Sequence, residues 1–130
     1  MRIINLLFSF QGRIPRLSFW VGLISIFGIF LAVGGIMNAL AGEDGNSKYD
    51  SIVGSVLAPL CIWIALAIQI KRWHDRGHSG WRVLINVIPI LGPLWVLVEL
   101  GFLKGSAGAN RFGADPLQTA APVETPARLA

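Results

Sequence analysis

The chain has 130 residues, of which 54% are apolar and 14% charged, and its formal net charge is +4 at pH 7. Soluble domains carry about 25% charged residues, so this composition excludes an ordinary soluble globular domain. The apolar residues gather in three long windows, which predicts a single all-α membrane domain over residues 1–116 and a disordered tail over residues 117–130. The single cysteine, Cys61, excludes an intramolecular disulfide and a zinc site built from cysteines.

A short apolar stretch precedes the first window. Residues 3–10 are mostly Ile, Leu and Phe, and they end at a break formed by Gly12-Arg13 and Pro15-Arg16. This pattern indicates an interfacial helix, which is too short to cross a bilayer. Its basic residues would lie among anionic lipid headgroups, where each contributes on the order of 1 kcal/mol. A frayed tail is the alternative.

The first two windows, residues 17–41 and 51–70, predict two transmembrane helices. At about 1.5 Å per helical residue, both can cross a hydrocarbon core of about 30 Å. The first is too long for the apolar region of a signal peptide, so we expect an uncleaved anchor. Pro59 should kink the second helix. Small residues spaced by four, such as Ser18 and Gly22, would let these helices pack against each other or form a homo-oligomer.

The distribution of basic residues predicts the orientation of these spans. Arg2, Arg13 and Arg16 precede the first window and four cations lie in residues 71–82, whereas the loop between the first two windows contains only Lys48. Lys and Arg are retained on the cytoplasmic side of short loops. We therefore expect the N-terminus and residues 71–82 to be cytoplasmic.

Residues 71–82 form the densest polar run of the chain, and we expect them to bind anionic lipid headgroups or a protein partner. A metal site from His74, Asp75 and His78 is disfavoured because zinc usually takes three or four protein ligands. Asp75 should pair with Arg72 or Arg76, and no complete catalytic triad is present, so no catalytic residue, metal or cofactor is expected. The candidate binding residues are Arg13, Arg16, Lys71, Arg72, Trp73, His74, Asp75, Arg76, Ser79 and Trp81.

The third window, residues 83–103, is interrupted by Pro89, Gly92 and Pro93 and contains the polar residues Asn86 and Glu99. Polar groups inside a membrane are costly and usually face a partner or water. A single kinked crossing is the working prediction, giving three transmembrane helices. In the alternative, two half-helices meet at residues 89–93 as a re-entrant segment, and Glu99 returns to the cytoplasmic side. Residues 110–116 should form a compact turn docked on residues 71–82, which adds Asn110, Arg111 and Asp115 to the candidate binding residues.

Three stretches of the sequence, Phe10 to Trp20, Lys71 to Trp81 and Asn110 to Pro116, resemble the signature motifs of the YhaH/YhaI-like family of bacterial inner-membrane proteins (domain of unknown function 805). Trp73 and Arg82 depart from the usual family pattern. The resemblance implies a small multi-pass protein of the bacterial inner (plasma) membrane, and it implies no reaction.

The leading functional hypothesis is a non-enzymatic membrane protein that binds a protein partner or anionic lipid through a basic cytoplasmic face. Homo-oligomers and other membrane proteins are the protein partners expected, and nucleic acid is not. The alternative is an oligomeric small transporter or channel subunit that uses the broken third window and Glu99, as discontinuous helices do in transporters.

Overall fold

The computed structural model describes residues 7–41 and 48–118, which are helices and connecting loops. The elements are α2 (Arg16–Ala41), α3 (Lys48–Asp75), the 3₁₀ helix η1 (Gly80–Val87) and α4 (Leu91–Gly101). An isolated β-bridge joins Asn110 to Gly113. The all-α prediction is confirmed. Most of the expected interfacial helix and the tail beyond residue 118 lie outside the described residues.

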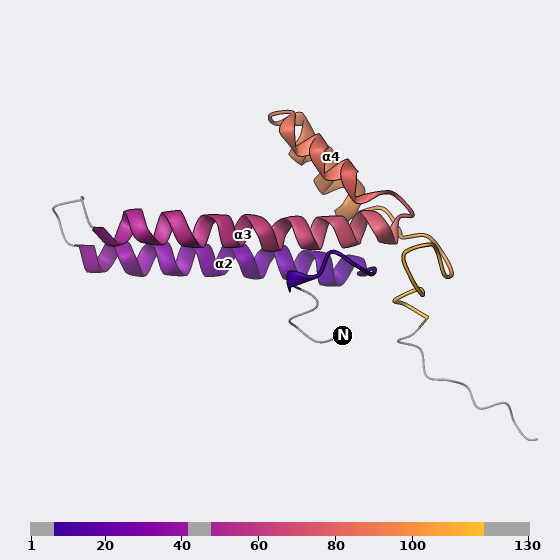
Figure 1. Ribbon diagram of the computed structural model, residues 1–130, viewed down its shortest axis with the longest axis horizontal. Helices are drawn as coiled ribbons and strands as arrows, with labels where there is room; N and C mark the ends of the chain where they lie inside the picture. The colour runs from indigo at the N-terminus through magenta and orange to yellow at the C-terminus, as the bar shows by residue number, and fades with distance from the viewer. Residues whose placement is uncertain (1–6, 42–47, 119–130) are drawn as a thin grey trace, which may run out of the picture.

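Helices α2 and α3 lie side by side and antiparallel along the long axis of the molecule (Figure 1). Both pass the length and hydropathy criteria for a membrane span, over Arg16–Leu40 and Gly54–Asp75. These are the first two predicted spans. Helix α3 continues without a break through Pro59 and ends later than expected, because it includes residues 71–75 of the polar run.

Helix α3 ends at Asp75, and Gly77 in the turn that follows has a φ of 74°. The backbone N–H of Gly77 donates to the carbonyl of His74 at 2.9 Å, and that of His78 donates to the carbonyl of Trp73 at 2.9 Å. These two bonds make a Schellman motif, in which a glycine adopts the left-handed conformation that other residues resist. The rings of Trp73 and His78 pack edge to face across the turn, with centroids 5.9 Å apart. The position of the glycine, and not the onset of polar residues, therefore determines where the helix stops.

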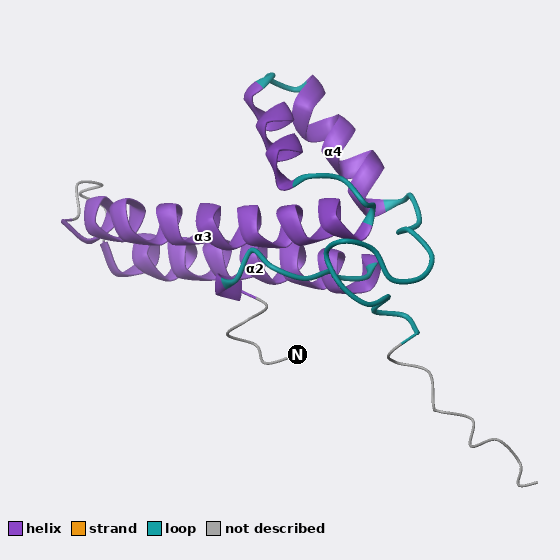
Figure 2. Cartoon of the chain, turned by 45° about the vertical axis from the view of Figure 1, so that its right-hand side comes forward, coloured by secondary structure: helices purple, strands orange, loops and turns teal. Residues whose placement is uncertain are grey.

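The third window does not form one continuous helix. Instead, η1 and α4 make a helical hairpin that leaves the α2–α3 pair at an angle near the C-terminal end of α3 (Figures 1 and 2). The turn between them contains Pro89 and Ile90, and Ile90 has a φ of 65°. A side chain at Gly92 would collide with the carbonyl of Ile85, so the glycine permits the close approach of the two halves. Pro93 falls in the first turn of α4, where a missing N–H leaves no hydrogen bond unmade.

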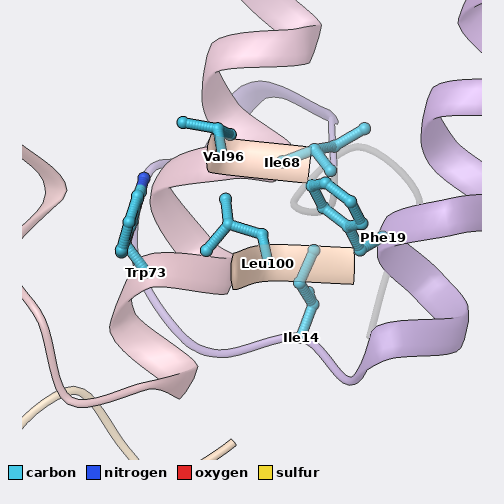
Figure 3. Packing of buried hydrophobic residues seen from close by; sticks show 6 residues of the cluster. All are labelled: Ile14, Phe19, Ile68, Trp73, Val96 and Leu100. Carbon is cyan, nitrogen blue, oxygen red and sulfur yellow. The ribbon is translucent and has the colours of Figure 1, made fainter. Parts of the chain in front are cut away.

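Among the residues that the structure describes, buried apolar side chains gather where the segment before α2, α2, α3 and α4 meet. Figure 3 shows the side chains from the segment before α2, from α2, α3 and α4 converging on one small cluster, formed by Ile14, Phe19, Ile68, Trp73, Val96 and Leu100. Along the rest of α2 most of the large side chains are exposed, for example Ile24 at 66% and Phe27 at 63%. A helix that is apolar all round suits a lipid environment.

Close packing of small residues between α2 and α3 is confirmed at Gly22, where a Cβ atom would press against the Ile68 side chain. It is not found at Gly28, Gly35 or Gly54, around which the structure leaves open space. Of these four glycines, Gly22 is therefore the one at which α2 and α3 pack closely.

Candidate functional site

A carboxylate between two guanidinium groups lies at the centre of the polar end, and we call Arg13, Arg72 and Asp75 the arginine cluster. Arg13 Nε donates to Asp75 Oδ1 at 3.0 Å, and Arg72 Nη1 forms an ion pair with Asp75 Oδ2. The side chains of Arg13, Arg72 and Asp75 are 1%, 0% and 5% exposed. The predicted pairing of Asp75 with Arg72 is confirmed, and Arg13 is an additional partner.

The remaining donors of Arg13 bind backbone carbonyls of the segment after α4. Its Nη2 atom donates to the carbonyl of Ser106 at 2.6 Å, and Nη1 donates to Gly108 at 2.6 Å and to Gly113 at 3.3 Å. Charge-assisted hydrogen bonds of this kind are about twice as strong as neutral ones. Arg13 therefore holds the N-terminal and C-terminal motifs together against the end of α3.

The C-terminal carbonyls of α4 receive a second set of donors. Arg72 donates to the carbonyls of Leu100 at 2.8 Å and Leu103 at 2.6 Å. A helix leaves its last carbonyls without partners inside the helix, and cations there also oppose the negative end of the helix dipole. Further donors to this end of α4 are Trp20 Nε1 to Gly101 at 3.2 Å, Arg16 Nη1 to Phe102 at 3.1 Å and Arg76 Nη1 to Lys104 at 2.9 Å.

Residues 110–116 dock on the end of α3, as expected. Asn110 Nδ2 donates to the carbonyl of His74 at 2.9 Å, and the imidazole of His74 stacks on the ring of Phe112 with centroids 3.9 Å apart. The Asp115 carboxylate accepts the backbone N–H groups of Leu117 at 3.0 Å and Gly108 at 3.1 Å. These bonds to the ionised form, the Leu117 bond above all, lower the pKa of Asp115.

A second carboxylate, Glu99 of α4, lies among several donors that we call the Glu99 cluster. Its Oε1 atom is 3.5 Å from Arg76 Nη2, 3.5 Å from Arg82 Nη1 and 3.8 Å from His78 Nε2. Its Oε2 atom accepts the indole N–H of Trp95 at 2.6 Å. Burial, followed by the charge of Arg82, lowers the pKa of His78, and Glu99 opposes this shift. Glu99 thus returns to the end of α3, as in the re-entrant alternative.

Asn86, the other polar residue of the third window, also bonds within the protein. Its Nδ2 atom donates to Gln69 Oε1 at 2.7 Å and to the carbonyl of Val83 at 2.9 Å. The bond to Gln69 connects η1 to the side of α3.

The structure divides the predicted binding residues into buried and exposed ones. The charged atoms of the buried basic residues point into the protein, and binding of lipid or a partner by these residues stays a prediction. Counting charges in a sequence does not reveal which of them are compensated internally. The buried candidates are Arg13, Lys71, Arg72, Trp73, Asp75 and Asp115, and the exposed ones are Arg16, Ser79, Trp81 and Arg111.

Two exposed cations of this end, Arg82 and Lys104, were missing from the predicted site. Lys104 carries the first positive charge after the third window, which is the signal that could have identified it. Arg82 is the last residue of the polar run 71–82.

Among the residues described, no group of three or more His, Cys, Asp and Glu side chains is arranged to hold a metal ion.

Two hollows open at this end. The larger, of about 760 Å³, lies between the start of α2 and residues 104–107, and its lining includes Arg16, Leu17, Trp20 and Lys104. We call it the α2 groove. The smaller, of about 420 Å³, is mostly apolar and lies between Phe10, His74 and the start of η1.

Comparison with known proteins places these features in a family. The profile described as "Protein of unknown function (DUF805)" matches residues 7–114. The chain is 30% identical to the inner membrane protein YhaH of Escherichia coli (strain K12), covering 89% of this chain and 93% of the relative. It is 31% identical to the inner membrane protein YhaI of the same strain, covering 83% and 86%. It is also 30% identical to the uncharacterized protein YiiR, covering 88% and 90%. No solved structure matches the chain significantly.

Proposed function

The chain belongs to the DUF805 family, and we propose that it is a non-enzymatic multi-pass inner-membrane protein whose basic cytoplasmic face binds anionic phospholipid. The observation that carries this proposal is the charge at one end of the molecule. Around the arginine cluster and the Glu99 cluster, eight Lys and Arg residues stand against three carboxylates, a surplus of five positive charges. Anionic lipid headgroups contribute about 1 kcal/mol per cation at a membrane surface.

The cations divide into two sets with different roles. The buried set holds segments together through Asp75 and backbone carbonyls. The exposed set remains accessible at the surface, and it is formed by Arg16, Arg82, Lys104 and Arg111. Trp81, which is 78% exposed, lies beside this set and suits the aromatic belt of a bilayer. Lipid binding is therefore assigned to the exposed set.

The proposed orientation places residues 104–118 on the cytoplasmic side together with the N-terminus. Arg13 lies before α2 and donates to the carbonyls of Ser106 and Gly108, and these hydrogen bonds support a location of both segments on the same side of the membrane. The surface of the hairpin is apolar, with Leu91 at 70% and Val87 at 76% exposed, as expected for a segment that enters the cytoplasmic leaflet and leaves on the same side.

Labelling of a single cysteine tests this orientation. In a Cys61→Ala background, a Gln118→Cys variant should resist an impermeant thiol reagent on intact cells and react once the inner membrane is opened. An Asn46→Cys variant, placed between α2 and α3, is the positive control and should react on intact cells. Labelling of both variants on intact cells would contradict the re-entrant hairpin.

The absence of catalysis is part of the proposal. His74 and Asp75 are neighbours, but His74 is held between the Gly12 carbonyl and the Phe112 ring, while Asp75 is held by two arginines. Neither group is placed to take a proton from a substrate. The transporter alternative is not favoured for a similar reason, because Glu99 and Asn86 both form hydrogen bonds within the protein. A flux across liposomes that the Glu99→Gln variant abolishes would support the transporter alternative again.

Native mass spectrometry of the purified protein tests the lipid proposal. The wild type should retain phosphatidylglycerol in preference to phosphatidylethanolamine. A variant with Gln at all four exposed cations should lose that preference, and a Lys48→Gln variant, changed at the other end of the spans, should keep it. Equal retention of the two lipids by the wild type would contradict the proposed function.

A further inference from the structure

We propose that the α2 groove is a specific site for the phosphate of one membrane phospholipid, bound by Arg16 and Lys104. This proposal rests on the proposed function and narrows it from a charged face to a single site. Its occupant is a phospholipid. The phosphodiester of this lipid lies in the groove, and its acyl chains continue along α2 into the bilayer.

The position of the groove suits such a ligand. One wall is the first turn of α2, with Arg16 and Leu17, and the other is formed by Gly101 at the end of α4 and by residues 104–107 after it. Arg16 begins the span Arg16–Leu40, so the groove lies where a span meets the headgroup layer. The volume of about 760 Å³ is within the range of ligand sites, about 300–1,000 Å³, and accommodates a headgroup with the first part of its chains.

The charge of the groove favours an anion. Two carboxylates contribute to its lining, but Asp75 is neutralised by Arg13 and Arg72, and Asp115 accepts backbone N–H groups. Arg16 and Lys104 are both exposed. Arg16 uses one terminal nitrogen on the carbonyl of Phe102, and a guanidinium retains further donors for a phosphate in that geometry.

The apolar part of the lining distinguishes a lipid from a free phosphate. Leu17 is 74% exposed at the membrane end of the groove. The indole of Trp20 is fixed there by its bond to the Gly101 carbonyl and by edge-to-face packing on Phe102, with centroids 5.7 Å apart. A small inorganic anion would contact neither side chain, whereas the glycerol and first methylenes of a phospholipid would cover both.

The test compares two double variants of the full-length protein that lose the same charge from the same face. Arg16→Gln with Lys104→Gln removes the groove cations, and Arg82→Gln with Arg111→Gln is the matched control outside the groove. Each is titrated with phosphatidylglycerol by native mass spectrometry, after circular dichroism has shown equal helix content. The groove variant should bind the first lipid at least about tenfold more weakly, since two headgroup contacts are lost. The control also loses two cations of the exposed set, so it should weaken binding as well, but several-fold less than the groove variant, because its cations act on the headgroup only through the screened surface potential.

Each other outcome overturns a defined part of the proposal. Unchanged lipid binding by the groove variant, or an equal loss in both double variants, removes the specific site and leaves the proposed function intact. If the wild type shows no preference for phosphatidylglycerol, the proposed function itself is contradicted. Leu17→Gln should weaken the binding of phosphatidylglycerol and leave the binding of inorganic phosphate unchanged. Competition by inorganic phosphate at the same concentration as the lipid would instead identify a free-phosphate site.

Discussion

The arginine cluster and the Glu99 cluster each place a carboxylate between two arginines, yet they differ in closeness and burial. Asp75 is 3.0 Å from Arg13 and its side chain is 5% exposed, whereas Glu99 is 3.5 Å from both of its arginines and 10% exposed. Arg82 of the Glu99 cluster is 46% exposed. The guanidinium groups around Asp75 are completed by backbone carbonyls, so that cluster is a structural junction. The Glu99 cluster holds the hairpin to α3 through longer and more exposed contacts.

Burial is the physical reason for the difference. An ion pair removed from water is stable only when its remaining hydrogen-bonding groups are satisfied. Arg13 and Arg72 meet this condition with carbonyls at the C-terminal end of α4, just after it, and in residues 106–113. From the sequence alone, Arg13 and Arg72 could have faced lipid headgroups. They are buried instead, because the segments around them fold over their side chains.

The largest effect is expected for Asp75→Asn. It leaves two buried guanidinium groups without a counter-charge, and breaking a buried pair in this way costs about 3–5 kcal/mol. Thermal unfolding in detergent, followed by circular dichroism, should show a large drop in Tm. Glu99→Gln is the matched comparison and should cost about 1 kcal/mol, because its partners are partly solvated. Equal effects of the two variants would abolish the distinction between the clusters.

Gly105→Ala should have an intermediate effect, because its Cβ atom would overlap the Asp75 carboxylate. Relief of that overlap must move either the carboxylate or the segment that carries Ser106, and overpacking of this kind costs about 1–3 kcal/mol. The control is Gly34→Ala, since the structure has open space around Gly34. The same unfolding measurement should show a lower Tm for Gly105→Ala alone. A Tm equal to that of the control would show that the cluster tolerates displacement.

The smallest effect is expected from pH at His78. Its pKa is lowered from 6.5 by burial and by Arg82, so below about pH 6.5 the unfolded chain binds more protons than the folded one. Stability should therefore fall as the pH drops below about 6.5 and stay level above it. His78→Gln should flatten this dependence when Tm values at pH 5 and pH 7.5 are compared. A wild type that is more stable at pH 5 than at pH 7.5, relative to the variant, would contradict the sign.

Sequence reasoning predicted some features of the polar end and missed others. The pairing of Asp75 with Arg72 and the docking of residues 110–116 followed from local charge and turn composition. The role of Arg13 did not, because its partners are Asp75, 62 residues away in the chain, and backbone carbonyls more than 90 residues away. The hairpin was foreseen only as an alternative to a crossing, since about 20 apolar residues interrupted by prolines suit both.

The sequence by itself determined the membrane class, the two long spans and the family, because apolar length and motif order are properties of consecutive residues. Only the tertiary structure decided which cations are buried and where Glu99 lies. It also decided that α4 returns to the end of α3. Each of these depends on contacts between segments that are distant in the chain, where hydrogen bonds to backbone carbonyls compensate charges that no count of residues can assign.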